Sequence, residues 1–149
     1  MNMKTRLFIL LLSIILCCVL QTSCTTNSNL AQKGEVEAVS DRIWTYSQSH
    51  PDGFTIDIRT MTEPTEGIAV SYSATQGRHS RKNLNRVVRH AMRHDGYVGG
   101  WLDTTDSLYY FDSTRLFPED SLDAAIKFGL KNEQKAIYSI KDGKEIKLN

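Results

Sequence analysis

The feature that most restricts how this chain can fold is an apolar run near its N-terminus. Residues 7–20 (LFILLLSIILCCVL) hold one polar side chain, that of Ser13, and follow a short segment that carries Lys4 and Arg6 but no acid. As a helix this run would extend about 21 Å, which is short of the roughly 30 Å hydrocarbon core of a bilayer. A basic start, a short apolar run and small polar residues after it are typical of a cleavable secretory signal peptide. We therefore expect the chain to be exported, with an uncleaved membrane anchor as the alternative.

The residues that follow the apolar run are Gln21, Thr22, Ser23 and Cys24. Residues 1–24 resemble a bacterial lipoprotein with a type II signal peptide, in which small residues precede a Cys; Gln21 stands where that family usually has Leu. The resemblance implies that the Cys24 sulfur receives a diacylglycerol group and that Cys24 becomes the mature N-terminus. It also implies attachment to a membrane of the bacterial cell envelope, at its periplasmic face or at the cell surface. Secretion without a lipid is the alternative, and the resemblance carries no information about the domain that follows.

The cysteine content agrees with lipid attachment. Cys17 and Cys18 lie inside the apolar run and would be removed with the signal peptide, which leaves Cys24 as the one Cys of the mature chain. An exported protein with a single Cys forms no internal disulfide. A free thiol would be a liability in an oxidising compartment, and lipid attachment removes that liability.

Removal of the signal peptide changes the charge balance. The chain has 18 Lys and Arg and 17 Asp and Glu, a net charge of +1. Cleavage after Ser23 takes away Lys4 and Arg6, so 16 basic residues (18 minus 2) face 17 acidic ones and the net charge becomes −1. Such a balance does not predict a nucleic-acid partner or a membrane-surface role for the domain. We expect a signal peptide over residues 1–23, a flexible polar tether over 24–34 and a single domain over 35–149.

Hydrophobic periodicity predicts the elements of the domain. Apolar residues at steps of three and four predict helices over 35–48, 81–94 and 118–130. Alternating and aromatic-rich segments predict strands over 54–59, 68–72, 97–103, 108–113 and 135–140, with a short partner over 145–148. The first two strands are expected to form one antiparallel hairpin, and the next two a second hairpin. The order α-β-β-α-β-β-α-β, with or without a final strand, predicts an α+β fold: a mainly antiparallel sheet of four to six strands with about three helices on one face.

The predicted helix over 81–94 has an uneven charge distribution. Ser80 is expected to cap its start and Gly96 to follow its end, while the apolar stripe centres on Val88 and Ala91. The opposite face carries Lys82, Arg86, Arg89 and Arg93, without any acid. A face of this kind could bind an acidic protein, phosphate groups or anionic lipid heads. A plain solvated face is the alternative, although solvated faces usually mix the two signs of charge.

Two histidines of the same helix have the spacing of metal ligands. His90 and His94 are four residues apart, which places both imidazoles on one helix face. No Glu lies between them where a zinc-hydrolase helix carries its base, and Arg89 and Arg93 would repel a divalent cation. We therefore expect no metal and no cofactor here, and interpret the pair as partly exposed helix histidines.

The predicted hairpin over 97–113 is rich in aromatic residues. Gly99 and Gly100 have no side chains, so they could open a shallow slot beneath Trp101 and either Tyr109 or Tyr110. Such a slot could take a glycan, a base or a peptide. Cross-strand aromatic packing is the alternative, in which the glycines mark a bulge or a close approach of other elements.

No catalytic motif is present. The mature chain lacks a Gly-x-Ser-x-Gly motif, a phosphate-binding Gly-rich loop and a Cys nucleophile, although Asp57, Asp103 and Asp112 lie on predicted strands and could converge. The main hypothesis is a non-enzymatic binding module, such as an inhibitor or immunity-type lipoprotein, whose partner is an acidic protein or a glycan. The residues expected to contact that partner are Lys82, Arg86, Arg89, Arg93, Trp101 and Tyr109. The alternatives are a small hydrolase or transferase that uses His79, His90 or an Asp, and a structural or mobile-element accessory lipoprotein.

Mass spectrometry of the mature N-terminus tests the expected export and lipid attachment. We expect the mature chain to begin at Cys24 and to carry a diacylglycerol group on the Cys24 sulfur. An unmodified Cys24, or a mature chain that begins at another residue, would contradict the lipoprotein prediction.

Overall fold

The computed structural model describes residues 30–148 of the 149-residue chain. The predicted signal peptide and Cys24 lie outside these residues. A helix covers residues 30–47, so residues 30–34, expected within a flexible tether, are helical. From Val36 onward the chain belongs to one compact unit that extends to the C-terminus. Between residues 30 and 148, no helix has both the length and the apolar character needed to cross a membrane.

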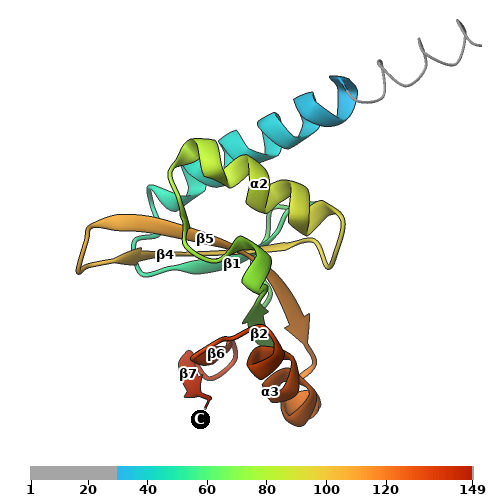
Figure 1. The fold of residues 1–149 in the computed structure, drawn as a ribbon, viewed down its shortest axis with the longest axis vertical. Helices are drawn as coiled ribbons and strands as arrows, with labels where there is room; N and C mark the ends of the chain where they lie inside the picture. The colour runs from blue at the N-terminus through green and yellow to red at the C-terminus, as the bar shows by residue number, and fades with distance from the viewer. Residues whose placement is uncertain (1–29, 149) are drawn as a thin grey trace, which may run out of the picture. The chain divides into compact units, whose positions relative to one another are not determined.

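After the helix over 30–47, strands and helices alternate along the chain (Figure 1). The strands are β1 (Phe54–Asp57), β2 (Ile68–Ser71), β3 (Arg78–His79), β4 (Tyr97–Asp103), β5 (Leu108–Phe117), β6 (Ala136–Ser139) and β7 (Lys144–Lys147). The helices are α2 (Arg81–Met92) and α3 (Leu122–Lys131), with short 3-10 turns η1 (Ser73–Thr75) and η2 (Glu119–Ser121). The α+β class and the predicted order of elements are confirmed. The short strand β3 is an addition that no sequence pattern indicated.

All the strands belong to one antiparallel sheet of seven strands, one more than expected because of β3. The order is β1-β4-β5-β2-β6-β7, which leaves β1 and β7 at the two ends, and β3 pairs with the first half of β5. The predicted hairpin of β4 and β5 is confirmed, with Trp101 opposite Tyr110. The predicted hairpin of β1 and β2 is wrong, because β1 pairs with β4, whereas β2 pairs with β5 and β6.

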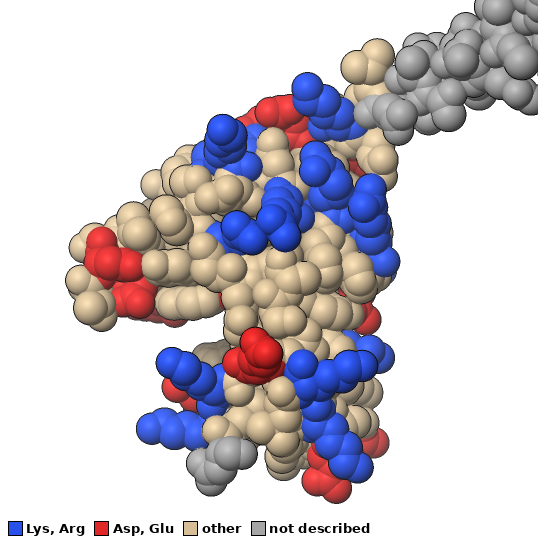
Figure 2. All heavy atoms as spheres, in the orientation of Figure 1, with Lys and Arg blue, Asp and Glu red and all other residues tan. Residues whose placement is uncertain are grey.

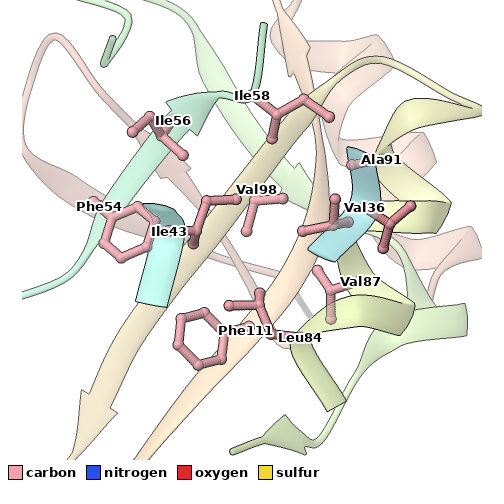
Figure 3. Packing of buried hydrophobic residues seen from close by; sticks show 11 residues of the cluster. Val36, Ile43, Phe54, Ile56, Ile58, Leu84, Val87, Ala91, Val98 and Phe111 are labelled. Carbon is pink, nitrogen blue, oxygen red and sulfur yellow. The ribbon is translucent and has the colours of Figure 1, made fainter. Parts of the chain in front are cut away.

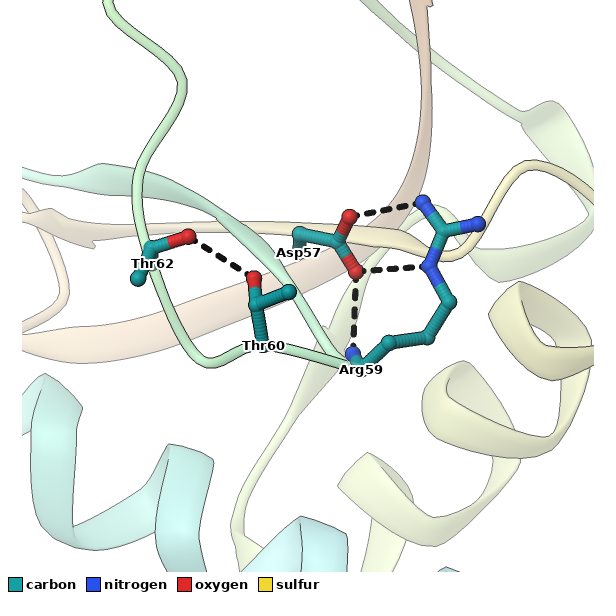
Figure 4. Close-up of polar contacts among 4 residues, drawn as sticks. All are labelled: Asp57, Arg59, Thr60 and Thr62. Atoms are coloured by element: carbon teal, nitrogen blue, oxygen red, sulfur yellow. Dashed lines mark hydrogen bonds and ion pairs between the residues drawn. The ribbon is translucent and has the colours of Figure 1, made fainter.

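The turn after β1 explains why β2 does not return beside it (Figure 4). The carboxylate of Asp57 accepts hydrogen bonds from the backbone N–H, Nε and Nη2 of Arg59, at 2.9, 2.8 and 2.6 Å. Met61 has a left-handed backbone with φ +59°, and the N–H of Asp57 donates to the carbonyl of Thr62 at 2.9 Å. The hydroxyls of Thr60 and Thr62 lie 2.7 Å apart. The chain therefore closes a tight local turn on the end of β1, and β2 begins elsewhere in the sheet.

The larger core lies between one half of the sheet and two helices (Figure 3). The helices contribute Val36, Ile43, Leu84, Val87, Val88 and Ala91, and the sheet side contributes Phe54, Ile56, Ile58, Val98 and Phe111. None of these residues is more than 8% exposed. The apolar stripe predicted for α2 is therefore the face that packs on β4 and β5, and the opposite face of α2 points to solvent.

A smaller core lies where α3 packs on β2 and β6. It contains Ile68, Val70, Phe117, Ala125 and Ile137. Gly129 allows this packing, because a Cβ at that position would lie 2.5 Å from the Leu148 side chain and 3.0 Å from that of Ile137. Phe111 of the larger core and Phe117 of the smaller one both come from β5, and their even spacing directs both to the same side of the strand.

Leu84 tests the packing of the larger core. Because Leu84 is fully buried, Leu84→Ala should lower the free energy of unfolding by about 2–5 kcal/mol. Chemical denaturation should show almost no loss for the control Leu130→Ala, since Leu130 is 49% exposed. Equal losses in the two variants would contradict the placement of α2 on the sheet.

Candidate binding surfaces

The position of α2 agrees with the sequence prediction, but its cap and its end differ. The helix begins directly after Ser80, as predicted, and ends at Met92 rather than at His94. The predicted cap is wrong, because the Ser80 side chain makes no hydrogen bond to the start of the helix. The N–H of His94 donates to the carbonyl of Ala91, three residues back, at 3.0 Å, so the last turn has the tighter 3-10 geometry. Gly96 follows with a left-handed φ of +80°, as expected for the residue that ends this helix.

The outer face of α2 is cationic. Its four exposed cations are Lys82, Arg86, Arg89 and Arg93, which together we call the basic face. None of them forms an ion pair with any residue of the described part of the chain, where the four ion pairs use other cations. Arg81 of the same helix, by contrast, contacts Asp41 at 2.6 Å. In Figure 2, Lys and Arg predominate over the area where Figure 1 places α2, whereas acids lie at the tip of the β4–β5 hairpin.

His90 and His94 lie side by side, as their spacing predicts, in a small packed cluster. Their rings stack at 3.8 Å, and Tyr72 packs on both at 4.9 and 5.0 Å. The Tyr72 hydroxyl donates to the carboxylate of Asp95, whose other oxygen lies 3.8 Å from Nε of Arg115. Burial, and next the contact with Asp95, raises the pKa of Tyr72 to about 12. Burial and then the neighbouring His94 lower the pKa of His90, which favours the neutral form of this imidazole.

His79, which the enzyme alternative names beside His90, does not join this cluster. His79 lies on β3, where its ring is 5.7 Å from that of Tyr110. Residues 30–148 contain no group of three His, Cys, Asp or Glu side chains placed to hold a metal ion. In the same residues, one hydrogen bond joins a His to another side chain, between the sequence neighbours Ser49 and His50 at 3.0 Å. The described histidines therefore make no hydrogen bond to a side chain from a different element of the fold.

The aromatic residues of the β4–β5 hairpin lie on two opposite sides of the sheet. Trp101 stacks on Tyr110 at 5.6 Å and is 42% exposed. Tyr109 points the other way, stacks on Phe54 at 6.1 Å, and donates its hydroxyl to the carbonyl of His50 at 2.6 Å. Because successive strand residues alternate in direction, Trp101 and Tyr109 cannot act on one ligand from the same face.

The paired glycines of β4 provide space for neighbouring side chains. A Cβ on Gly100 would lie 2.9 Å from ring atoms of both Phe54 and Tyr109, and a Cβ on Gly99 would lie 3.0 Å from Oγ1 of Thr114. The space above each glycine is therefore already filled. This geometry favours the alternative of cross-strand packing over an open slot at these positions.

The three aspartates of the predicted strands do not converge. Asp57 is bound to Arg59, whose guanidinium lowers the pKa of that carboxyl, and Asp103 accepts the N–H of Thr105 at 2.8 Å in the hairpin turn. Asp112 is buried at 3% exposure opposite Gly99, and its Oδ1 has no hydrogen-bond partner among residues 30–148. Burial raises the pKa of Asp112 to about 7. Four successive residues in the middle of β5, Phe111 to Thr114, are buried, whereas the alternation expected of a half-buried strand would leave Asp112 exposed beside a buried Phe111.

Comparison with known proteins finds no matching protein family, no matching curated protein and no matching solved structure. Any function must therefore be inferred from the chemistry of the described surface. That surface offers, on α2, cations without ion-pair partners among residues 30–148 and, on the sheet, an exposed Trp101 that stacks on Tyr110. The first can attract anionic groups, and the second can stack on an apolar face.

Asp112 predicts an unusual pH dependence of stability. Its folded pKa of about 7 exceeds the ordinary value of 3.8, so between these values the folded chain keeps a proton that the unfolded chain has lost. Stability should therefore fall as pH rises through this window, by up to about 4 kcal/mol. Asp112→Asn should remove this fall and be more stable than the wild type at pH 8 in denaturant titrations.

The variant Asp57→Asn is a control, because Asp57 contributes a pH dependence of stability opposite in sign to that of Asp112. Because Arg59 lowers the pKa of Asp57, the wild-type pair contributes stability above the unfolded pKa that is lost as pH falls through the folded pKa. The variant should therefore be less stable than the wild type at neutral pH. The test of Asp112 compares the free energy of unfolding of the wild type with that of Asp112→Asn at each pH. If the wild type loses no stability relative to the variant between pH 4 and 7, the burial of a carboxyl at position 112 is contradicted.

Proposed function

We propose that this protein is an exported lipoprotein, held at a membrane of the bacterial cell envelope through a lipid on Cys24, whose domain binds an acidic protein. In this proposal it acts without catalysis, as an inhibitor or an immunity-type protein acts on its target. The observation that carries the proposal is the basic face, because its four cations are exposed and have no ion-pair partner within residues 30–148.

The arrangement of the cations supports an extended acidic partner. From Lys82 to Arg93 the row runs about 16 Å along the helix, at 1.5 Å per residue. A single phosphate group would contact only one or two of these side chains, whereas an acidic protein surface could contact all of them. Long-range attraction between such surfaces accelerates association and selects against basic partners.

The rigidity of the helix supports the same role. The inner side of α2 is fixed by fully buried residues, Leu84, Val87, Val88 and Ala91, each 0% exposed. Arg81 anchors the start of the helix to Asp41 at 2.6 Å. The backbone that carries the cations is therefore already ordered, and binding would require ordering of the outer side chains alone.

The double variant Arg86→Glu with Arg89→Glu tests the proposed function. The full-length lipoprotein would be crosslinked in its native envelope, the captured protein identified and purified, and its affinity measured by surface plasmon resonance. We expect an acidic partner, a loss of affinity of at least tenfold for the double variant, and weaker wild-type binding at high salt, since exposed charges are screened.

Lys127→Glu with Lys131→Glu provides the matched control. These two residues are also exposed and one turn apart, but they lie on α3. This variant has the same change in net charge and should bind as the wild type does. The proposal fails if the α2 variant keeps wild-type affinity, or if both variants lose it equally. Salt-sensitive binding to anionic phospholipid vesicles, without any acidic protein partner, would instead assign the basic face to the membrane.

A further inference from the structure

We propose that a pocket at the tip of the β4–β5 hairpin binds a neutral sugar ring. The pocket has a volume of about 440 Å³, which lies within the usual range for small-molecule sites. Three segments of the compact unit form it: the end of the helix over 30–47, the junction of β3 with α2, and the hairpin tip. None of the four cations of the basic face lines it, so the two surfaces can be tested separately.

The lining of the pocket is uncharged. It contains no Asp, Glu, Lys or Arg, although these types make up 23% of the chain. Its apolar walls come from Trp44, Leu102, Leu108 and Tyr109. Leu108 remains 37% exposed, which leaves apolar surface for a ligand to cover. A charged ligand would lose water there without gaining an opposite charge, so the lining favours a neutral occupant.

Polar groups are placed around these apolar walls. Ser80 lines the pocket and makes no side-chain hydrogen bond to the start of α2, which leaves its hydroxyl able to donate and accept. The amide nitrogen of Gln48 donates to neighbouring groups of its own helix, at 3.4 and 3.1 Å, which leaves the amide oxygen as an acceptor. Tyr109 gives its hydroxyl proton to the carbonyl of His50 and so offers mainly its ring.

The backbone at the pocket is strained. Residues 30–148 contain four residues other than Gly with positive φ, and two of them, Ser80 and Ser107, line the pocket. Ser80 has φ 76° and ψ 152°, a conformation that is almost restricted to Gly. Strained backbone conformations persist where the surrounding structure holds them in place, and they are found most often at ligand and active sites.

These features match the two sides of a sugar ring. A neutral sugar presents an apolar C–H face and a rim of hydroxyls that both donate and accept hydrogen bonds. The rings of Trp44 and Tyr109 suit the apolar face, while Ser80 and Gln48 suit the hydroxyls. A hydrocarbon chain would leave these polar groups without partners, and an ionic ligand would lack an opposite charge.

Tryptophan fluorescence can test this pocket directly, because the chain has two Trp residues, Trp44 and Trp101. Trp101→Phe leaves Trp44 as the one reporter, and Trp44 lines the pocket. The mature full-length variant would be titrated with glucose, galactose, mannose and their neutral disaccharides, each up to 50 mM, and with sodium glucuronate as the charged comparison. We expect a saturable change in Trp44 emission with at least one neutral sugar and a response at least tenfold weaker with glucuronate.

Two further variants locate the binding. Leu108→Lys places a charge in the lining and should weaken the response to the neutral sugar at least tenfold, whereas Leu130→Lys, at an exposed Leu of α3, should leave it unchanged. Gln48→Ala should weaken it about threefold to tenfold through loss of one hydrogen bond. The proposal is overturned if no neutral sugar changes Trp44 emission, if glucuronate binds equally well, or if Leu108→Lys has no effect. A sugar response from Trp101 alone, in a Trp44→Phe variant, would move the site to the exposed Trp101–Tyr110 stack and also overturn it.

Discussion

β5 holds the two cores of the domain in one sheet. It pairs with β4 along one edge and with β3 and then β2 along the other, and it supplies Phe111 to the larger core and Phe117 to the smaller one. Between these residues Arg115 packs over the rings of Phe117 and Phe128, at 4.8 and 5.3 Å, and reaches toward Asp95 at the end of α2. Because close-packed interiors transmit displacements, a shift of β5 would disturb both helical layers together.

The helices and most strands could be predicted because their information is local. The three-and-four spacing of apolar residues in α2 places one face in the core, and the same spacing places Lys82 and Arg86 outside. Strand partners are not local in this sense. β1 and β2 are neighbours in the sequence, yet the turn closed by Asp57 and Arg59 separates them, and β1 finds β4 instead. Alternation indicates which residues share a face, but it does not indicate which strand lies beside another.

The same limit applies to the candidate sites, which the sequence predicts only where a single helix or strand determines them. Exposure of the basic face follows from helical geometry, whereas the separation of Trp101 from Tyr109 depends on the register of the hairpin, which pairs Trp101 with Tyr110. The burial of Asp112 depends on distant segments that cover the middle of β5. One of them is η1, where Oγ1 of Thr75 accepts the N–H of Ser113 at 2.9 Å. The pocket at the hairpin tip likewise needs three segments that are far apart in the sequence, so no local pattern could reveal it.

β1 and β7 lie at the two ends of the sheet, where a strand edge can be left without a partner strand. An unpaired strand edge can pair with a strand of another chain, and charged side chains on the edge strand oppose such pairing. β7 exposes Lys144, Glu145 and Lys147, while the end of β1 is closed by its own return through Thr62. Lipoproteins confined to one membrane plane meet each other far more often than freely diffusing proteins do. In the proposed setting, these two edge features would keep neighbouring copies from joining their sheets into larger aggregates.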